Sequence, residues 1–241
     1  MKISQRSISV VLPVHQQEDH IGQILLDLFD GVRDLTSDLQ MIVLVNASSD
    51  RSAEMARSVA SQCPGMIVVE LAEAGWGSAV RSGLSLATGD LLCFTNSART
   101  TPRDLRTAVA LGLLNEHHAV KAIRRSRESV IRRMGSVLYN FEARTLFGLA
   151  SWDINGTPKV FPREMAVLLE LQEDGDLLDL EWLVECIAAH HQLIEYPVTS
   201  VRRHSGRSTT RLRSAIRMYV GAFRLRRRLR GRPALAPRRL P

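Results

Sequence analysis

ISVVLPVHQQEDHIGQILLDL, residues 8–28, opens with a short apolar run rich in β-branched residues, which is typical of a buried parallel strand. We expect that strand over Ile8–Val14. A polar turn follows, with Glu18 and Asp19 where the dipole of a helix favours acidic side chains. Apolar residues then recur at the spacing of one helix face, at Ile21, Ile24, Leu25 and Leu28. The stretch therefore predicts a strand, a turn and a helix in succession.

The same succession is repeated three more times. The expected strands are Met41–Val45, Met66–Leu71 and Leu91–Phe94, and the expected helices are Ser52–Cys63, Ser78–Ala87 and one from Pro102 to about Glu116. Such alternation predicts an α/β fold of the Rossmann-like kind, with a mostly parallel central sheet and flanking helices. Ligands bind beyond the carboxyl ends of parallel strands. The candidate site is therefore formed by the loops after Val14, Val45 and Phe94.

The second half of the chain is less regular but continues the same domain. Strands are expected at Ala119–Ile123, around Val160 and Phe161, and at Leu193–Val198; helices are expected at Met134–Phe147 and Asp179–Ala189. No repeat or low-complexity linker separates the two halves. We therefore expect one domain over residues 1–208.

Composition indicates a globular protein with an uneven charge. Of the 241 residues 45% are hydrophobic and 24% are charged, which is typical of a globular rather than a disordered chain. From Arg202 onward there are fourteen arginines and no acid, whereas the preceding residues hold more acids than bases. Cys63, Cys93 and Cys186 lie far apart in apolar stretches, so we expect buried free thiols in a reducing compartment. No apolar run reaches the length of a membrane span.

Five groups of motifs in order carry a resemblance to a known family. They are SVVLPVHQQEDHI (Ser9–Ile21), MIVLVNASSDRS (Met41–Ser52), GWGSAVRSGLSLATGDLLCF (Gly75–Phe94), the stretches Lys121–Gly148 and Asp153–Arg163, and PVTSVRRHSGRS (Pro197–Ser208). Together they resemble the family 2 glycosyltransferases, and within them the polyprenyl-phosphate, dolichol-phosphate-like transferases. The resemblance implies the nucleotide-diphospho-sugar transferase (GT-A) fold, and transfer of a sugar from a nucleoside diphosphate to a lipid-phosphate or saccharide acceptor with inversion.

The sequence departs from the family's pattern where the nucleotide and its metal would bind. The family's aspartate pair after the second strand is replaced here by Val45 and Asn46. Its Asp-x-Asp metal motif after the fourth strand is replaced by Asn96-Ser97-Ala98, which offers one neutral carbonyl oxygen, whereas Mg²⁺ and Mn²⁺ prefer anionic oxygen ligands. We therefore predict weak or no metal dependence and name no definite cofactor. Mg²⁺ or Mn²⁺ remains an open alternative, although the ligand motif is degraded.

The resemblance assigns roles to individual residues. Donor-binding residues would be Pro13, Glu18, Asn46, Ser48, Asp50, Arg81, Asn96 and Arg99. Phosphate- or acceptor-binding residues would be Lys121, Arg124, Asp153, Lys159, Arg202, Arg203 and Arg207. Asp179 and Glu181 would be catalytic, or would orient the sugar, because an anionic phosphate acceptor needs no base. Gly75, Gly77 and Gly83 fit either a phosphate-cradling turn or a tight turn into a helix.

Two interpretations of the missing aspartates stay open. In an altered enzyme, Arg81 or Arg99 would neutralise the diphosphate in place of the metal. In a decayed enzyme, the fold would remain as a binding or regulatory partner. The first is the interpretation that we favour from the sequence.

The basic C-terminal segment has three interpretations. Residues 209–230 place apolar residues among arginines and predict a basic amphipathic helix on an anionic membrane surface. Nucleic-acid binding is less favoured, and a solvated tail is the simplest alternative. Residues 231–241 contain three prolines and are expected to be disordered. The resulting prediction is a cytoplasmic glycosyltransferase of cell-envelope type at the inner face of the membrane, with a membrane-protein partner left open.

Overall fold

A computed structural model describes residues 4–124, 130–151, 153–198 and 212–229. Its sheet has seven strands in the order β3-β2-β1-β4-β6-β5-β7. Their bounds are β1 Ile8–Val14, β2 Leu39–Asn46, β3 Met66–Leu71, β4 Leu91–Phe94, β5 His118–Arg124, β6 Lys159–Pro162 and β7 Gln192–Val198. All run parallel except β6, which is antiparallel to both of its neighbours. The predicted α/β fold with a mostly parallel sheet is confirmed.

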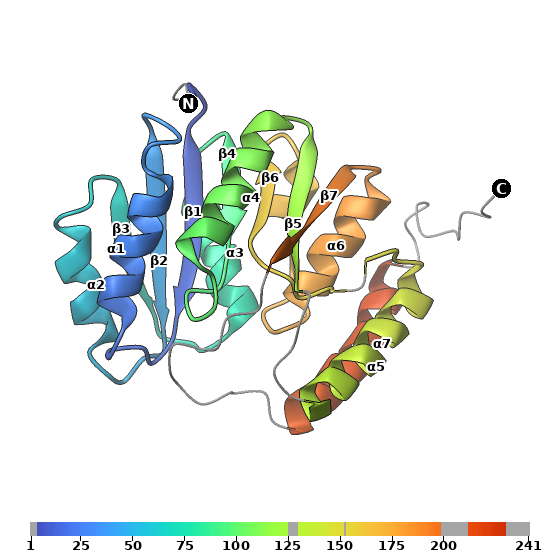
Figure 1. The fold of residues 1–241 in the computed structure, drawn as a ribbon. Helices are drawn as coiled ribbons and strands as arrows, with labels where there is room; N and C mark the ends of the chain where they lie inside the picture. Colours follow the sequence, from blue (N-terminus) through green and yellow to red (C-terminus); the bar gives the residue numbers. More distant parts are fainter. Residues whose placement is uncertain (1–3, 125–129, 152, 199–211, 230–241) are drawn as a thin grey trace.

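Helices cover both faces of this sheet (Figure 1). They are α1 Ile21–Val32, α2 Ser52–Ala60, α3 Trp76–Leu86, α4 Pro102–Leu114, α5 Val130–Phe147, α6 Leu178–Ala188 and α7 Leu212–Arg228, with a short 3₁₀ turn at Ala166–Leu169. One hydrophobic core lies between the sheet and α1, α2 and α4, and the other lies beneath α3 and α6. Because both faces are covered, a strand such as β1 is apolar throughout: Val10 and Leu12 enter the first core and Val11 enters the second.

A local sequence signal explains where α4 begins. The hydroxyl of Thr101 accepts a hydrogen bond from the backbone N–H of Asp104 at 3.1 Å, and Pro102 occupies the first helical position of α4. The helix begins at the predicted residue for this reason.

The position of β6 gives the second half its arrangement. Only four residues long, this strand lies between β4 and β5, with Lys159 opposite Phe94 at the carboxyl end of β4. The segment that precedes β6 therefore lies at the same edge of the sheet as the loops after β1, β2 and β4.

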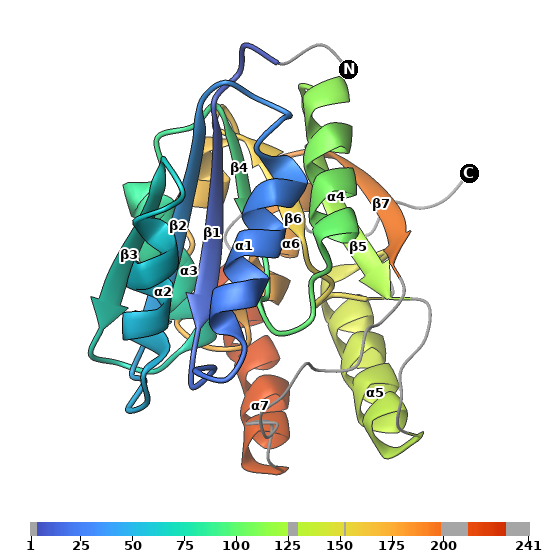
Figure 2. The ribbon, with the colours of Figure 1, turned by 60° about the vertical axis from the view of Figure 1, so that its left-hand side comes forward.

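The helices α5 and α7 pack against each other and extend beyond the carboxyl edge of the sheet (Figures 1 and 2). Ala222, Leu225 and Leu229 are buried in the second core. The C-terminal helix is thus packed on the domain, a contact that the sequence interpretation did not include. The boundary predicted at residue 208 falls in 199–211, outside the described residues, as does the predicted tail 231–241.

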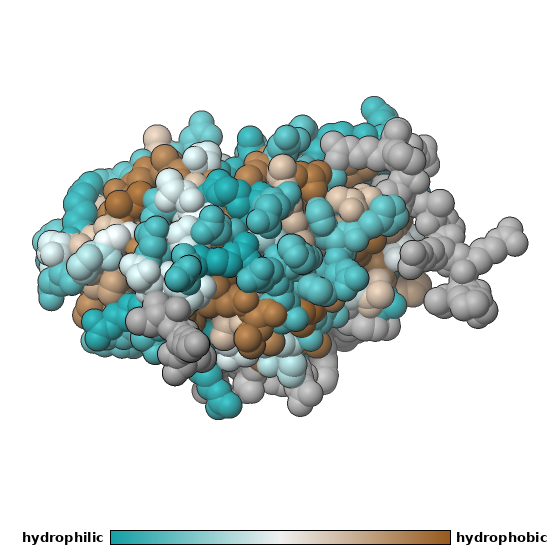
Figure 3. All heavy atoms as spheres, turned by 90° about the horizontal axis from the view of Figure 1, so that it is seen from above, coloured by the Kyte–Doolittle hydropathy of each residue, from teal (hydrophilic) through white to brown (hydrophobic). Residues whose placement is uncertain are grey.

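The opposite edge of the molecule, where β1, β2 and β4 begin, is mostly hydrophilic with small separate hydrophobic patches (Figure 3). Among the described helices, none combines the length and the apolar character that crossing a bilayer requires. The three cysteines are free and buried, as predicted.

Candidate functional site

The loops after β1 and β2 are joined by reciprocal hydrogen bonds. The backbone N–H of Glu18 donates to Asp50 Oδ2 at 3.1 Å, and the N–H of Arg51 donates to Glu18 Oε2 at 2.8 Å. The N–H of Gln16 donates to the Ser48 hydroxyl at 3.0 Å. Three predicted donor-binding residues, Glu18, Ser48 and Asp50, are therefore brought together at the carboxyl edge.

The charge of Asp50 is stabilised within this pair of loops. Partial burial alone would raise the pKa of its carboxyl group, but the Ser52 hydroxyl and the backbone N–H groups of Glu18 and Ser52 more than offset that effect. The pKa of Asp50 consequently lies below its usual value, and the carboxylate stays ionised in neutral solution.

Asn46, the last residue of β2, connects the strand to the start of α3. Its Nδ2 donates to the carbonyl oxygen of Gly75 at 3.1 Å, and its own backbone carbonyl lies 2.7 Å from His15 Nδ1. Its Oδ1 is buried and has no hydrogen-bond partner among the described atoms. A buried acceptor of this kind is suited to a donor group on a ligand.

The loop after β4 uses its own polar atoms to form a turn. Asn96 Oδ1 accepts the backbone N–H of Ala98 at 2.9 Å, and the Asn96 carbonyl accepts the N–H of Thr100 at 3.1 Å. The Ser97 hydroxyl donates to the carbonyl of Pro13 at 3.0 Å, which joins this loop to β1. Pro13 near the end of β1 is thus in contact with the loop that contains Asn96 and the half-buried Arg99.

This donor set does not fit a divalent cation. The single side-chain oxygen of Asn96 that could face a metal is already an acceptor within the turn, and Ala98 has no ligand atom. In the part of the chain that the structure describes, no three His, Cys, Asp or Glu side chains gather as a metal site would require.

The glycines at the start of α3 make room for another segment of the backbone. A Cβ on Gly77 would overlap the carbonyl oxygen of Glu173, and one on Gly75 would lie 2.8 Å from the carbonyl oxygen of Asp174. The Asp174 carbonyl also accepts the N–H of Ser78 at 3.0 Å. Close packing accounts for these glycines, as it does for Gly83, whose Cβ would overlap Val11. The structure favours the tight-turn interpretation over the phosphate-cradling one.

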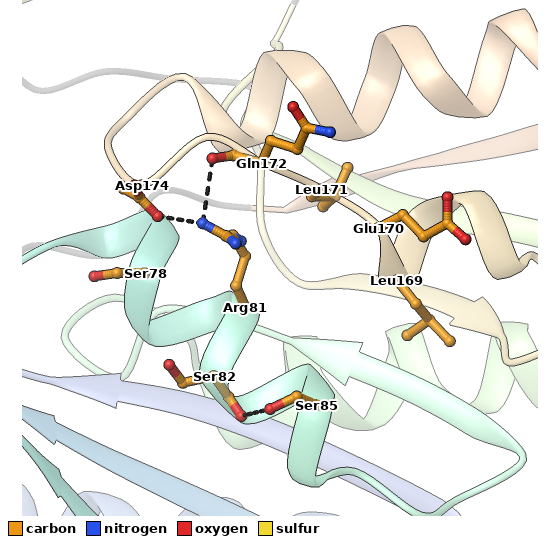
Figure 4. A pocket seen from close by; sticks show the side chains of 9 residues that line it. All are labelled: Ser78, Arg81, Ser82, Ser85, Leu169, Glu170, Leu171, Gln172 and Asp174. Carbon is orange, nitrogen blue, oxygen red and sulfur yellow. Dashed lines mark hydrogen bonds and ion pairs between the residues drawn. The ribbon is translucent and has the colours of Figure 1, made fainter.

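Arg81 is directed toward the same segment. Its guanidinium forms an ion pair with Asp174 and donates to the carbonyl oxygen of Gln172 at 3.2 Å (Figure 4). These groups line an open hollow of about 460 Å³ between α3 and residues 169–174. The described contacts of Arg81 lie with that segment, so the structure does not group it with Asn96 and Arg99 as the sequence predicted.

Two of the predicted phosphate-binding residues, Arg124 at the end of β5 and Asp153, form a partly buried pair. Asp153 accepts hydrogen bonds from Arg124 Nε at 2.8 Å, Nη2 at 2.6 Å and the backbone N–H at 2.9 Å. Burial of the guanidinium lowers its pKa, but the Asp153 carboxylate raises it more, so the pKa of Arg124 lies above its usual value. This bidentate geometry fixes the loop before β6 against β5.

Lys121 is also enclosed rather than open to a ligand. Its side chain is fully buried, and its ammonium donates to the Ser151 hydroxyl at 3.0 Å and to Glu195 Oε1 at 2.9 Å. The predicted phosphate contact of Lys121 would require one of these bonds to be exchanged for a ligand.

Lys159 and Asp179 form the most deeply buried ion pair of the site. The ammonium of Lys159 contacts Asp179 Oδ1, donates to the carbonyl of Ile154 at 3.1 Å, and lies 5.5 Å from the ring centroid of Phe94 and 5.4 Å from that of Trp182. Burial lowers the pKa of Lys159 to about 8, and Asp179 offsets part of that effect. The predicted catalytic carboxylate Asp179 is thus held by an internal cation.

Glu181 is engaged through both oxygens. Oε2 accepts the N–H groups of Gln172 at 2.9 Å and Glu173 at 2.8 Å, and Oε1 accepts Arg228 Nη2 at 2.5 Å. Arg228 also contacts Glu173 Oε1 at 3.2 Å. We call the Arg228–Glu181–Glu173 group the α7 clamp. Sequence reasoning missed Arg228, although cations in the last turn of a helix are a known signal. Arg202, Arg203 and Arg207 lie outside the described residues.

This architecture, with its polar loops at the carboxyl edge, is that of the GT-A nucleotide-diphospho-sugar transferases. Glucosyl-3-phosphoglycerate synthase from Mycobacterium tuberculosis, solved with Mn²⁺, UDP and phosphoglyceric acid, superposes with a TM-score of 0.72 at 22% identity, covering 92% of this chain and 78% of that one. The same synthase with Mg²⁺ and UDP gives a TM-score of 0.71 at 22% identity, covering 92% and 79%. Similarity at this level of identity establishes the fold.

The family follows from the sequence match. Residues 9–165 match the profile described as Glycosyl transferase family 2, and the chain belongs to that family. Its curated relatives include undecaprenyl-phosphate 4-deoxy-4-formamido-L-arabinose transferases. The one from Photorhabdus laumondii is 24% identical over 213 residues, and the one from Klebsiella pneumoniae subsp. pneumoniae is 23% identical over 207. Each match covers 84% of this chain and 62% of the relative, so the chain spans about three fifths of their length.

Proposed function

We propose that this chain transfers a sugar from a nucleoside-diphosphate donor to a lipid phosphate, with inversion and without a divalent metal. The observation that carries the proposal is the junction of the loops after β1, β2 and β4, where Glu18 and Asp50 are tied together at the edge used by donors in α/β sheets. These loops fall within the residues that match the family. Glu18, Ser48 and Asp50 would contact the nucleoside, and the free acceptor of Asn46 would meet a donor group on its base.

The metal-free character is supported by the loop after β4. Asn96 uses its side-chain oxygen within the turn, while Arg99 follows in the same turn and is half-buried. A guanidinium beside the diphosphate would stabilise the negative charge that develops on the leaving group. We assign this role to Arg99 rather than to Arg81, because Arg99 belongs to the loop after β4 itself, whereas Arg81 lies on α3 and contacts Gln172 and Asp174.

A lipid-phosphate acceptor is supported by the state of the two candidate catalytic acids. Asp179 is paired with Lys159 and Glu181 with Arg228, so neither is poised to deprotonate a sugar hydroxyl. A phosphate acceptor is already anionic and needs no base. Both carboxylates then act by positioning the acceptor side of the site. The lipid named in the relatives' activity supports this choice, and on this proposal the chain would act at the cytoplasmic, inner face of a membrane.

A second candidate is a binding or regulatory domain without catalysis, alone or with a membrane-protein partner. It is favoured by the internal pairing of Lys121, Arg124 and Lys159, because each of these three cations already has an acidic partner. Nucleotide binding separates the two candidates.

The test is thermal unfolding of the purified chain with UDP-, GDP- and dTDP-sugars, each with Mn²⁺ or with chelator. A ligand at one hundred times its Kd stabilises by about 2.7 kcal/mol, an easily measured shift in Tm. We expect one nucleotide to give a shift that chelator does not change. Arg99→Gln should reduce it, whereas Arg103→Gln, an exposed arginine on α4, should not. The absence of a shift with every nucleotide contradicts the proposal and supports the non-catalytic domain.

A further inference from the structure

The C-terminal helix α7 has two opposite faces with different surroundings. Ala222, Leu225 and Leu229 are buried against the domain. The other face exposes Val220, Phe223, Arg224 and Arg227, which follow the i, i+3, i+4, i+7 spacing of a single stripe. Apolar and cationic side chains therefore share one exposed surface, which we call the α7 stripe.

The neighbouring helix α5 adds a large apolar side chain, Phe141, at the level of Val220 on α7. Both helices run toward the sheet (Figure 1), and the guanidinium of Arg226 lies 5.9 Å from the ring centroid of Phe147. Phe141 lies six residues before Phe147 on α5, and Val220 lies six residues before Arg226 on α7. Because both helices rise by the same length per residue, Phe141 and Val220 lie at the same level along the helix pair. Phe141 is 62% exposed, Phe223 58% and Val220 45%. Half of the exposed large hydrophobic residues of the described chain thus lie on this helix pair.

The placement of the pair relates this surface to the site. Both helices extend beyond the carboxyl edge of the sheet, the edge at which the donor loops lie (Figure 2). The α7 clamp fixes the end of α7 nearest the sheet, because Arg228 is bonded to Glu181 and Glu173. The α7 stripe therefore lies on a helix that projects past the same edge of the sheet as the donor loops.

We propose that the α7 stripe, together with Phe141, docks the domain on an anionic lipid surface. Arginines near such a surface are attracted by its negative potential, and phenylalanine and valine side chains enter the boundary between headgroups and acyl chains. The apolar members distinguish this surface from a nucleic-acid site, where charge neutralisation of phosphates dominates. Docking in this orientation presents the carboxyl edge to the bilayer. This orientation deepens the proposal of a lipid-phosphate acceptor and rests on that proposal. The docking itself is measured without any sugar transfer.

The experiment is co-sedimentation of the full chain with vesicles of phosphatidylcholine alone and of phosphatidylcholine with phosphatidylglycerol. We expect binding to the anionic vesicles only. Replacing both Arg224 and Arg227 by Gln should lower the partition coefficient by roughly fivefold for each arginine, and Phe223→Ser should lower it on the order of tenfold. The matched controls are Leu114→Ser and Arg103→Gln on α4, where Leu114 is 80% exposed.

Several results would overturn the proposal. One is the absence of binding to anionic vesicles, and another is an equal loss of vesicle binding in the α4 controls. A third is a loss of binding with the arginine changes but none with Phe223→Ser, which would indicate simple charge attraction. Tighter binding to single-stranded RNA than to vesicles would favour nucleic acid. The nucleotide-sugar thermal shift, measured on the same variants, separates the two proposals: vesicle binding without a nucleotide shift leaves the docking standing and removes the transferase.

Discussion

At the scale of single residues, Lys159 and Asp179 form a deeply buried ion pair beside two aromatic rings. Lys159 is fully buried between Phe94 and Trp182. Desolvation of such a pair is costly, and the mutual attraction only roughly compensates for it. The removal of one partner is therefore expected to cost far more than the removal of both.

Lys159→Met should destabilise the fold by about 3–5 kcal/mol, because it leaves Asp179 as an uncompensated buried charge. The double variant Lys159→Met with Asp179→Leu should recover most of that loss. Urea unfolding of the two single variants and the double variant gives the coupling energy directly.

Arg106→Met provides the comparison, because its ion pair with Asp34 is largely exposed and should contribute at most about 1 kcal/mol. Equal losses for Lys159→Met and Arg106→Met, or no recovery in the double variant, would show that the loss at Lys159 does not come from leaving Asp179 without its counter-charge.

The sequence could name most of these residues but not their partners. Asp153 and Lys159 were predicted from one short motif, and the structure places both at the edge of the site. The acid that each cation meets comes from far along the chain, as with Lys121 and Glu195. Local spacing carries no information on such pairs, so an internal counter-charge and a ligand contact look alike in the sequence.

At the scale of elements, the start of α3 and residues 172–174 form one packed unit. The segment is held by the N–H of Ser78, by Arg81 and by Glu181 on α6. Gly77 allows this approach because the carbonyl of Glu173 occupies the space of its missing Cβ.

Gly77→Ala should destabilise the protein by about 1–3 kcal/mol, as overpacking usually does. The sign of this stability change is informative, because alanine in a helix normally stabilises by up to about 1 kcal/mol relative to glycine, which is the opposite effect. The change is read from the midpoint of urea unfolding.

Gly175→Ala is the matched control in the same segment, since a Cβ there would meet nothing within 4 Å. It should be neutral or slightly stabilising. A loss at Gly175 as large as that at Gly77 would mean that the segment, and not its contact with α3, is sensitive to substitution.

The strands and helices of the first half were predictable because each strand is a short apolar run and each helix repeats its apolar residues at helical spacing. β1, β3 and β4 have the predicted bounds, and α4 begins at the predicted Pro102. The direction of β6 was not predictable, since four residues carry no signal for parallel or antiparallel pairing. The glycine motif at α3 was ambiguous for a related reason: glycine permits the approach of a phosphate or of a carbonyl group, and its sequence context is the same for both.

At the scale of the whole molecule, the α7 clamp joins the C-terminal helix to the second core. Arg228 is partly exposed, but its partner Glu181 is buried. Removal of Arg228 would deprive the Glu181 carboxylate of a charged hydrogen-bond donor. Arg228→Met should therefore destabilise the protein by about 1–3 kcal/mol, the cost of leaving a buried acceptor underpaired. Thermal or urea unfolding measures this loss.

Arg227→Met, one residue earlier and exposed, should leave the stability within about 0.5 kcal/mol. Glu181→Gln in the Arg228→Met background should restore part of the loss, because a neutral amide costs less to bury. If Arg227→Met and Arg228→Met behave alike, the clamp does not hold α7.

The order of the second core along the chain has a consequence for biosynthesis. This core draws on residues from Val11 to Leu229. During translation the layer of α1, α2 and α4 can assemble first, while Trp182 and its apolar neighbours on the other face await the arrival of α7. A nascent chain that stops before Arg228 emerges presents an open hydrophobic surface and an unpaired Glu181, and is a natural substrate for chaperones and proteases.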